Sequence, residues 1–72
     1  MQYDRLKELR EQRELTQKEV AGILGINQRV YSNYETGKRE IPCHHLITLA
    51  DYYNVSTDYL LGRTERRTFY KG

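Results

Sequence analysis

The sequence has one cysteine and one proline among its 72 residues, and it has no long hydrophobic run. Because Cys43 is the single cysteine, no disulfide can form within the chain, which excludes a small secreted scaffold stapled by disulfides. A membrane-spanning helix needs roughly 20 consecutive apolar residues, and neither such a run nor a signal peptide is present. We therefore expect a soluble, cytoplasmic protein that has no membrane partner.

Patterns that predict β-strands are also missing. Apolar residues do not alternate with polar ones but recur at intervals of three and four, as they do along one face of a helix. A chain of this length forms one small domain, whose core buries only about 60% of the unfolded surface. The pattern predicts an all-α fold, with a first helix over roughly residues 3–13 and four further helices whose apolar positions fall at residues 20–24, 30–34, 46–53 and 59–61.

Charge is unevenly distributed along the chain, although the net charge of +2 says little about partners. Residues 1–40 carry eight Lys or Arg against seven Asp or Glu. Residues 41–62 carry two Asp and no Lys or Arg, whereas residues 63–72 carry four Lys or Arg and one Glu. The basic side chains therefore lie in the first half and in the tail. We interpret residues 41–62 as the part of the chain with a mainly structural role.

The expected helix starts carry matching cap residues. Thr16 and Glu19 have the T-x-x-E spacing of a capping box at the start of the second helix. Asn27 and Ser56 can cap the third and fifth helices. Pro42 suits the first turn of the fourth helix, where a missing backbone N–H costs nothing.

The expected helix ends carry glycines. Gly25, Gly37 and Gly62 each follow an apolar-periodic segment, at a position that favours the left-handed backbone conformation. Only two residues separate Leu24 from Asn27, so a very tight turn must join the second and third helices. Two short helices joined by a glycine-containing turn are the layout of a helix-turn-helix motif.

The third helix, at about residues 28–36, has two distinct faces. At about 100° per residue, Val30, Tyr31 and Tyr34 form one apolar arc, and Glu35 lies at its border. The opposite face has no carboxylate, and its side chains are of the types that hydrogen-bond to base edges in the DNA major groove. We predict that this face reads DNA bases through Gln28, Arg29, Ser32 and Asn33.

Three further residues are candidate phosphate contacts. Lys38 and Arg39 directly follow the third helix and could fix its register on DNA without reading sequence. Gln17 lies at the start of the second helix, where free backbone N–H groups and the helix dipole attract a phosphate. The polar face alone could equally be a solvated surface. The tight turn, the missing acids and the adjacent basic pair favour DNA contact.

Two long stretches resemble a known family. They are LKELREQRELTQKEVAGILGINQRVYSNYETGKR and LITLADYYNVSTDYLLG, and the likeness covers residues 3–62. The motifs L-T-Q-x-E-x-A, L-G-I, Y-E-x-G-K and V-S-x-D-Y-L-L-G are similar to those of the phage-repressor/Cro class of helix-turn-helix DNA-binding domains, also called the xenobiotic-response-element class. The resemblance implies a compact, lambda-repressor-like bundle of five short helices over residues 1–62 that binds operator DNA, commonly as a dimer.

The resemblance also implies roles for particular residues. By the family's pattern, Gln17 bonds a backbone phosphate, the four base-reading candidates face the groove, and Arg10 pairs with Glu35. Two positions depart from that pattern. Tyr31 stands where the family usually has Ile or Val, and Val30 stands where a small polar residue is common. We expect Tyr31 to pack inward with its hydroxyl reaching the edge of the core.

Other chemistries find little support. His44 and His45 are adjacent, so on a helix they point about 100° apart, and no second ligand pair follows at helical spacing. We expect Cys43 to be a small packing residue. Nothing resembles a nucleophile motif or a glycine-rich phosphate loop. We therefore expect no enzyme activity, no metal or other cofactor and no small-molecule ligand.

Among the seven tyrosines, Tyr53 and Tyr59 are expected in the core, whereas Tyr52 is the best candidate for an exposed patch. The last ten residues have lost helical periodicity. This basic tail is either disordered or functional, in which case it would contact phosphates or dock on a partner chain, using Arg63, Arg66, Arg67, Phe69 and Tyr70.

The sequence as a whole predicts a sequence-specific regulator of transcription, acting as a repressor, that binds double-stranded DNA. A homodimer would present two third helices about 34 Å apart to an inverted-repeat operator. The alternative is a protein–protein module, such as an antitoxin or adaptor, in which the same helix faces a protein partner. Binding to several phosphates weakens steeply as salt rises, and a mainly apolar protein interface should not.

Overall fold

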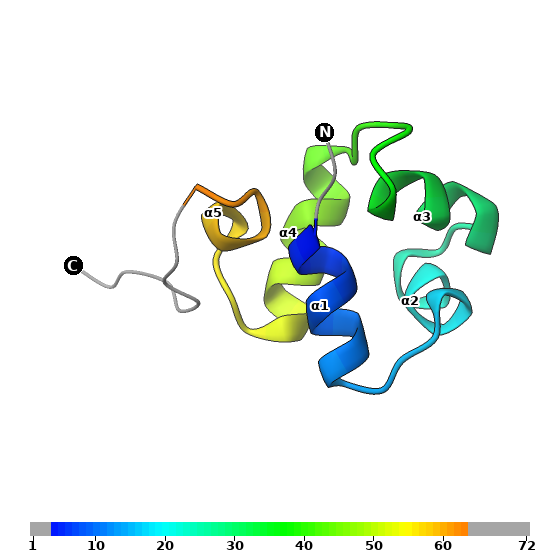
Figure 1. Ribbon diagram of the computed structural model, residues 1–72, viewed down its shortest axis with the longest axis horizontal. Helices are drawn as coiled ribbons and strands as arrows, with labels where there is room; N and C mark the ends of the chain where they lie inside the picture. The colour runs from blue at the N-terminus through cyan, green and yellow to red at the C-terminus, as the bar shows by residue number, and fades with distance from the viewer. Residues whose placement is uncertain (1–3, 64–72) are drawn as a thin grey trace.

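The computed structural model describes residues 4–63, which fold into five α-helices with no strand among them (Figure 1). The helices are α1 (Asp4–Gln12), α2 (Gln17–Leu24), α3 (Gln28–Glu35), α4 (Cys43–Tyr53) and α5 (Thr57–Leu60). In Figure 1, α1 crosses in front of α4, with α2 and α3 to one side and α5 to the other. The predicted all-α bundle of five short helices is confirmed.

One side chain from each helix is almost completely shielded from solvent. The five are 0–1% exposed and together connect all the helices: Leu6, Val20, Tyr31, Leu49 and Leu60. Burial of this apolar surface is the main favourable contribution to folding. Tyr53 and Tyr59 are also buried in the core, as predicted, and Tyr52 is 42% exposed.

The second helix begins as the sequence predicted. The Glu19 backbone N–H donates to Thr16 Oγ1 at 3.1 Å, and the Thr16 N–H donates to Glu19 Oε1 at 2.9 Å. Gly25 ends α2 in the left-handed conformation, with φ of 71°. The capping box and the glycine stop therefore define α2 from both ends.

Removing this cap should destabilise the domain measurably. Thr16→Ala leaves the Glu19 N–H without its side-chain acceptor, so we expect the free energy of unfolding to fall by about 1 kcal/mol. Urea titration followed by circular dichroism at 222 nm measures the change. Lys18→Ala alters an exposed position in the same helix turn and serves as the control. An equal effect in both variants would contradict the cap.

Side-chain N-caps also begin α3 and α5, whereas α4 has none. Asn27 Oδ1 accepts the Val30 N–H at 2.9 Å and Ser56 Oγ accepts the Tyr59 N–H at 3.0 Å, so both predicted N-caps are present. Pro42, however, is the N-cap of α4 and not part of its first turn.

One detail of α4 was not predicted, and a second contradicts its prediction. The helix ends at Asn54, whose φ of 57° is left-handed, and no glycine marks this position. Asparagine tolerates that conformation better than most residues, because its short polar side chain can hydrogen-bond locally. Cys43 is exposed and does not pack in the core, because the buried stripe of α4 begins one turn later, at Leu46.

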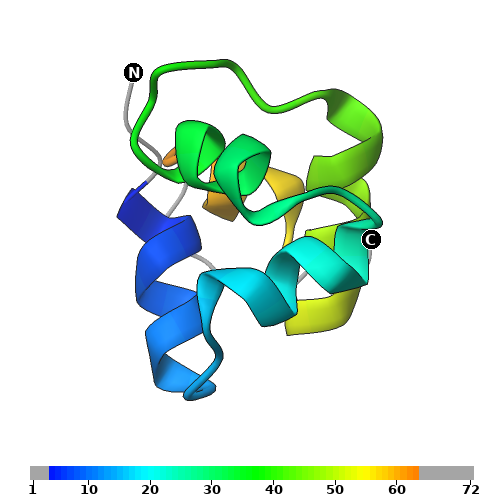
Figure 2. The same ribbon diagram turned by 90° about the vertical axis from the view of Figure 1, so that its right-hand side faces the viewer.

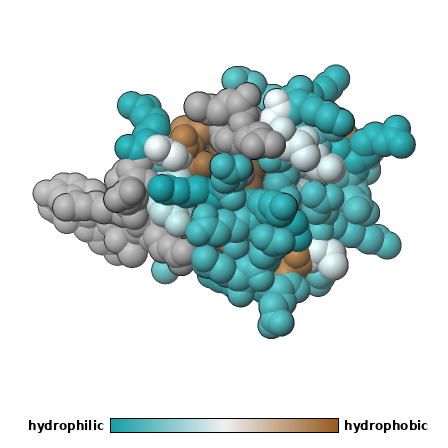
Figure 3. Space-filling view, in the orientation of Figure 1, coloured by the Kyte–Doolittle hydropathy of each residue, from teal (hydrophilic) through white to brown (hydrophobic). Residues whose placement is uncertain are grey.

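One face of the described chain is largely polar. Hydrophilic side chains cover most of the face shown in Figure 3, which is the face on which α1 lies nearest the viewer. None of the helices within residues 4–63 combines the length and the apolar character that crossing a membrane requires.

Candidate nucleic-acid interface

The third helix is held to the domain by its apolar side. Tyr31 and Tyr34 are buried, at 0% and 7% exposed, and Val30 packs against the core at its edge. α3 contacts α2 and α1, and Figure 2 looks directly onto the α2–α3 pair. Because this side faces inward, the opposite side of α3 is turned toward solvent.

That opposite side lines a shallow hollow on the surface. Seven residues surround it: Gln17, Asn27, Gln28, Arg29, Ser32, Asn33 and Lys38. The set contains all four predicted base-reading residues and two of the three predicted phosphate contacts. None of the seven is acidic, so no lining side chain would repel a nucleic-acid backbone.

Arg39 and Asn27 differ from expectation in their relation to the hollow. Arg39 is exposed but is not among the lining residues, and its backbone N–H donates to the Asn33 carbonyl at 3.1 Å. Asn27 lines the hollow, although the sequence assigned it only to the helix cap. Its position directly before Gln28 is the signal that could have identified it, because an N-cap residue lies beside the first turn of its helix.

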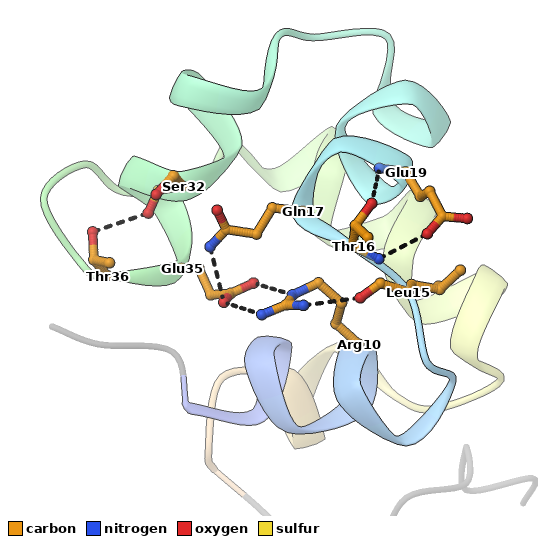
Figure 4. Close-up of polar contacts among 8 residues, drawn as sticks. All are labelled: Arg10, Leu15, Thr16, Gln17, Glu19, Ser32, Glu35 and Thr36. Carbon is orange, nitrogen blue, oxygen red and sulfur yellow. Dashed lines mark hydrogen bonds and ion pairs between the residues drawn. The ribbon is translucent and has the colours of Figure 1, made fainter.

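A partly buried ion pair lies next to Gln17, one of the residues that line the hollow (Figure 4). Arg10 Nε donates to Glu35 Oε2 and Arg10 Nη2 donates to Glu35 Oε1, both at 3.0 Å. The third donor, Arg10 Nη1, reaches the Leu15 carbonyl at 2.9 Å. The structure thus contains the pair that the family resemblance implied, and it connects α1 to the end of α3 and to the turn before α2.

Glu35 remains charged despite its burial. Its side chain is 3% exposed, against 13% for Arg10. Burial by itself raises the pKa of the Glu35 carboxyl, but hydrogen bonds donated by Arg10 above all, and by Gln17, hold that pKa below its ordinary value. The hydrogen bond to Glu35 likewise raises the pKa of Arg10.

Gln17 connects the hollow to this ion pair. Its Nε2 donates to Glu35 Oε1 at 3.3 Å, while the side chain also lines the hollow. The Gln17 side chain, which is predicted to contact a phosphate, therefore already makes a hydrogen bond within the domain.

Comparison with known proteins decides the family. A family model described as a helix-turn-helix domain matches residues 3–66. The chain belongs to this helix-turn-helix family. The predicted resemblance to the phage-repressor class of regulators is thereby confirmed.

Relatives of this helix-turn-helix chain occur in Bacillus subtilis (strain 168). The HTH-type transcriptional regulator ImmR is 49% identical over 61 residues, which are 85% of this chain and 48% of ImmR. YobD, an uncharacterised HTH-type transcriptional regulator, is 38% identical over 90% of this chain and 58% of its own length. The HTH-type transcriptional regulator AnsR is 37% identical over 93% of this chain and 58% of its own length.

The chain spans about half the length of the curated relatives it matches. No solved structure matches it.

Tyr31 is completely buried in the core of this helix-turn-helix domain. The prediction that its hydroxyl reaches the edge of the core is wrong, because the Tyr31 side chain is 0% exposed. The hydroxyl is buried without a hydrogen bond of good geometry. Burial, and then the nearby Glu35 carboxylate, raise the pKa of Tyr31 well above its ordinary value.

This burial predicts an alkaline loss of stability. A tyrosine whose folded-state pKa is raised contributes stability that is fully present below its unfolded pKa, near 10, and is lost as pH rises above it. Burial also raises the pKa of Tyr53 to about 12, so two residues contribute to the loss.

Tyr31→Phe should make the loss of stability above about pH 10 shallower. Denaturant unfolding at a series of pH values measures it, and Tyr52→Phe, at an exposed ring, is the control. A parent-like alkaline slope in Tyr31→Phe would show that ionisation of Tyr31 does not oppose folding.

The rings of the paired histidines lie close together at the start of α4, tilted by 45° to one another. Their ring centroids are 4.1 Å apart, with His44 exposed and His45 half-buried against Tyr34. Burial, and then His44, lower the pKa of His45. Across residues 4–63 the structure contains no group of three or more potential metal-ligating side chains.

Most of the tail predictions fall outside the described residues. Arg66, Arg67, Phe69 and Tyr70 lie there. Arg63 is described and exposed, and its backbone N–H donates to the Asp58 carbonyl at 2.9 Å.

Proposed function

We propose that this helix-turn-helix domain is a sequence-specific, double-stranded DNA-binding regulator of transcription that acts as a repressor. The observation that carries the proposal is the hollow along α3, which is lined by base-reading types of side chain and contains no acid. The relatives named as HTH-type transcriptional regulators add support. The proposed action is binding alone, without catalysis, cofactor or small-molecule ligand.

In this proposal α3 lies in the major groove. Arg29 suits the paired acceptors of guanine, whereas Gln28 and Asn33 suit the donor and acceptor of adenine. Gln17 and Lys38 would contact phosphates at the edge of the hollow, as would Arg39 beyond it. A homodimer on an inverted repeat would place the two α3 helices about 34 Å apart, one helical turn of DNA.

The readout is tested on a preferred site selected from a random DNA pool. Arg29→Ala and Asn33→Ala should each weaken binding by about 5- to 150-fold, the equivalent of one base contact, and relax the base preference at one position. Fluorescence anisotropy measures the affinity. Arg29→Lys is the matched control. It keeps the positive charge but lacks the planar guanidinium that pairs with guanine, so the base preference should still relax. Parent-like affinity and preference in both alanine variants would refute the assignment.

The second candidate function is a protein–protein module such as an antitoxin or adaptor. Exposed apolar side chains on α4 favour it, because Ile47 is 52% and Tyr52 is 42% exposed. Salt titration separates the two functions. DNA affinity should fall steeply as salt rises, with a log–log slope of about −0.9 per phosphate contacted. A salt-independent interaction with a protein partner, together with no selectable DNA site, would favour the module.

A further inference from the structure

Gln17 lies where two surface features of the domain meet. On one side it lines the hollow proposed to receive DNA. On the other it lines a smaller depression with both members of the buried ion pair, Arg10 and Glu35. It is therefore the side chain through which the ion pair reaches the proposed interface.

The charge of Glu35 dictates how the Gln17 carboxamide must lie. An ionised carboxylate can only accept hydrogen bonds, so the amide nitrogen of Gln17, and not its oxygen, has to face it. The geometry agrees, with Nε2 at 3.3 Å from Glu35 Oε1. In Figure 4 the Gln17 oxygen points away from Glu35. One Nε2–H is engaged by the carboxylate, and the second remains available as a donor.

Glu35 is itself rigidly held. Arg10 binds both of its carboxylate oxygens, and the Arg10 guanidinium is in turn tied to the Leu15 carbonyl. The backbone of Leu15 lies two residues before Gln17. The same guanidinium thus places the carboxylate and the turn that leads into α2, and these together define where the Gln17 side chain can go.

We propose that Glu35 is a positioning residue for DNA binding, which holds the Gln17 carboxamide with its second N–H ready to donate to a phosphate. The ion pair then serves the interface as well as the core. This inference rests on the proposed function. It goes beyond the pairing of Arg10 with Glu35, because it assigns the carboxylate an effect on affinity that is transmitted through one side chain.

The first test uses the parent protein without DNA. Nuclear magnetic resonance of the side-chain amides should show slow exchange with solvent for the Gln17 amide proton that is bonded to Glu35. Gln28, which is exposed on α3, is the matched control and should exchange rapidly. Exchange of the Gln17 protons as fast as those of Gln28 would overturn the proposal, whatever the DNA result.

The second test is a mutant cycle, in which the affinity for the selected DNA site is measured for each variant and for their combination. Gln17→Met keeps the length of the side chain but cannot donate, and it should weaken binding roughly 3- to 10-fold, the range expected for losing one pre-ordered side chain. The double replacement Arg10→Met/Glu35→Leu removes the anchor, and apolar substitutes for a buried pair are commonly tolerated by the fold. It should weaken binding by a similar factor.

The decisive measurement is the DNA affinity of the triple variant, which combines Gln17→Met with Arg10→Met/Glu35→Leu. If Glu35 acts through Gln17, adding Gln17→Met to the double replacement should cost less than twofold more. If Glu35 is only a structural residue, the two losses multiply, and the proposal fails. Circular dichroism confirms that each variant is folded before titration. Should the double replacement unfold, the exchange measurement on the parent still decides the question.

Failure of this inference is distinguishable from failure of the proposed function. A parent protein that selects no DNA site refutes the function, while the carboxamide exchange still reports whether Glu35 holds Gln17. A parent that binds DNA tightly but shows multiplying losses refutes only the positioning role.

Discussion

Replacing Arg10 with alanine should lower the free energy of unfolding by about 3–5 kcal/mol, the cost expected when one partner of a buried ion pair is removed. Glu35 is left behind with its side chain 3% exposed, and its carboxylate loses two hydrogen bonds at 3.0 Å. A domain of this size has little stability in reserve, so a large fraction of the variant should be unfolded at room temperature. Thermal and urea unfolding monitored by circular dichroism measure the loss.

A double variant shows whether the unpaired Glu35 charge is responsible. In Arg10→Met/Glu35→Leu both charges are absent, so most of the stability should return. If this double variant is as unstable as Arg10→Ala, the damage comes from lost packing and not from an unpaired carboxylate.

Acid titration gives an independent check on the same carboxylate. The folded-state pKa of Glu35 is lowered, so its contribution is present above its unfolded pKa, about 4.3, and is lost as pH falls below that value. Glu35→Gln should remove this part of the acid sensitivity. A parent and variant with parallel stability profiles below about pH 4.3 would contradict it.

Leu49→Ala should lower the free energy of unfolding by about 2–5 kcal/mol, because it opens a cavity in the centre of the bundle. Leu49 is 0% exposed on α4, the helix that packs against both α2 and α5. The midpoint of urea unfolding measures the loss. Ile47→Ala removes a similar side chain from the same helix, but at a position that is 52% exposed. It should change stability by less than about 0.5 kcal/mol, and a comparable loss at both positions would refute the assigned core.

These large effects constrain any DNA-binding experiment. A variant of Arg10 or Leu49 can lose DNA affinity simply because less of it is folded. Arg29 and Asn33 lie on the solvent side of α3, where substitution has a small effect on folding. Loss of binding at these two positions, with unchanged unfolding curves, is therefore the cleaner evidence for readout.

Most of the secondary structure could be predicted from the sequence because its signals are local. Thr16 and Glu19 cap α2 within a single turn, and Gly25 ends it by adopting a backbone angle that most residues avoid. Tyr31 and Tyr34, three positions apart, place one side of α3 inward. The polar side of α3 is what remains once the inward side is known, and it contains the four α3 residues that line the hollow.

The local signals were weaker at the ends of α4. Asn54 stops this helix in a conformation that glycine more often adopts, and Pro42 precedes the helix when it could equally have begun it. Cys43 has helical spacing to Leu46, yet it is exposed, because spacing within one helix does not show where the neighbouring helices end.

What the sequence by itself determined was five helices, the side-chain N-caps of α2, α3 and α5, the inward and outward faces of α3, and the helix-turn-helix family. Tertiary structure alone decided that the Tyr31 hydroxyl would be fully buried and that Gln17 would reach Glu35, 18 positions away along the chain. The reason is physical. Caps and helix periodicity act over a few residues, whereas enclosure and side-chain orientation depend on which helices come together in space.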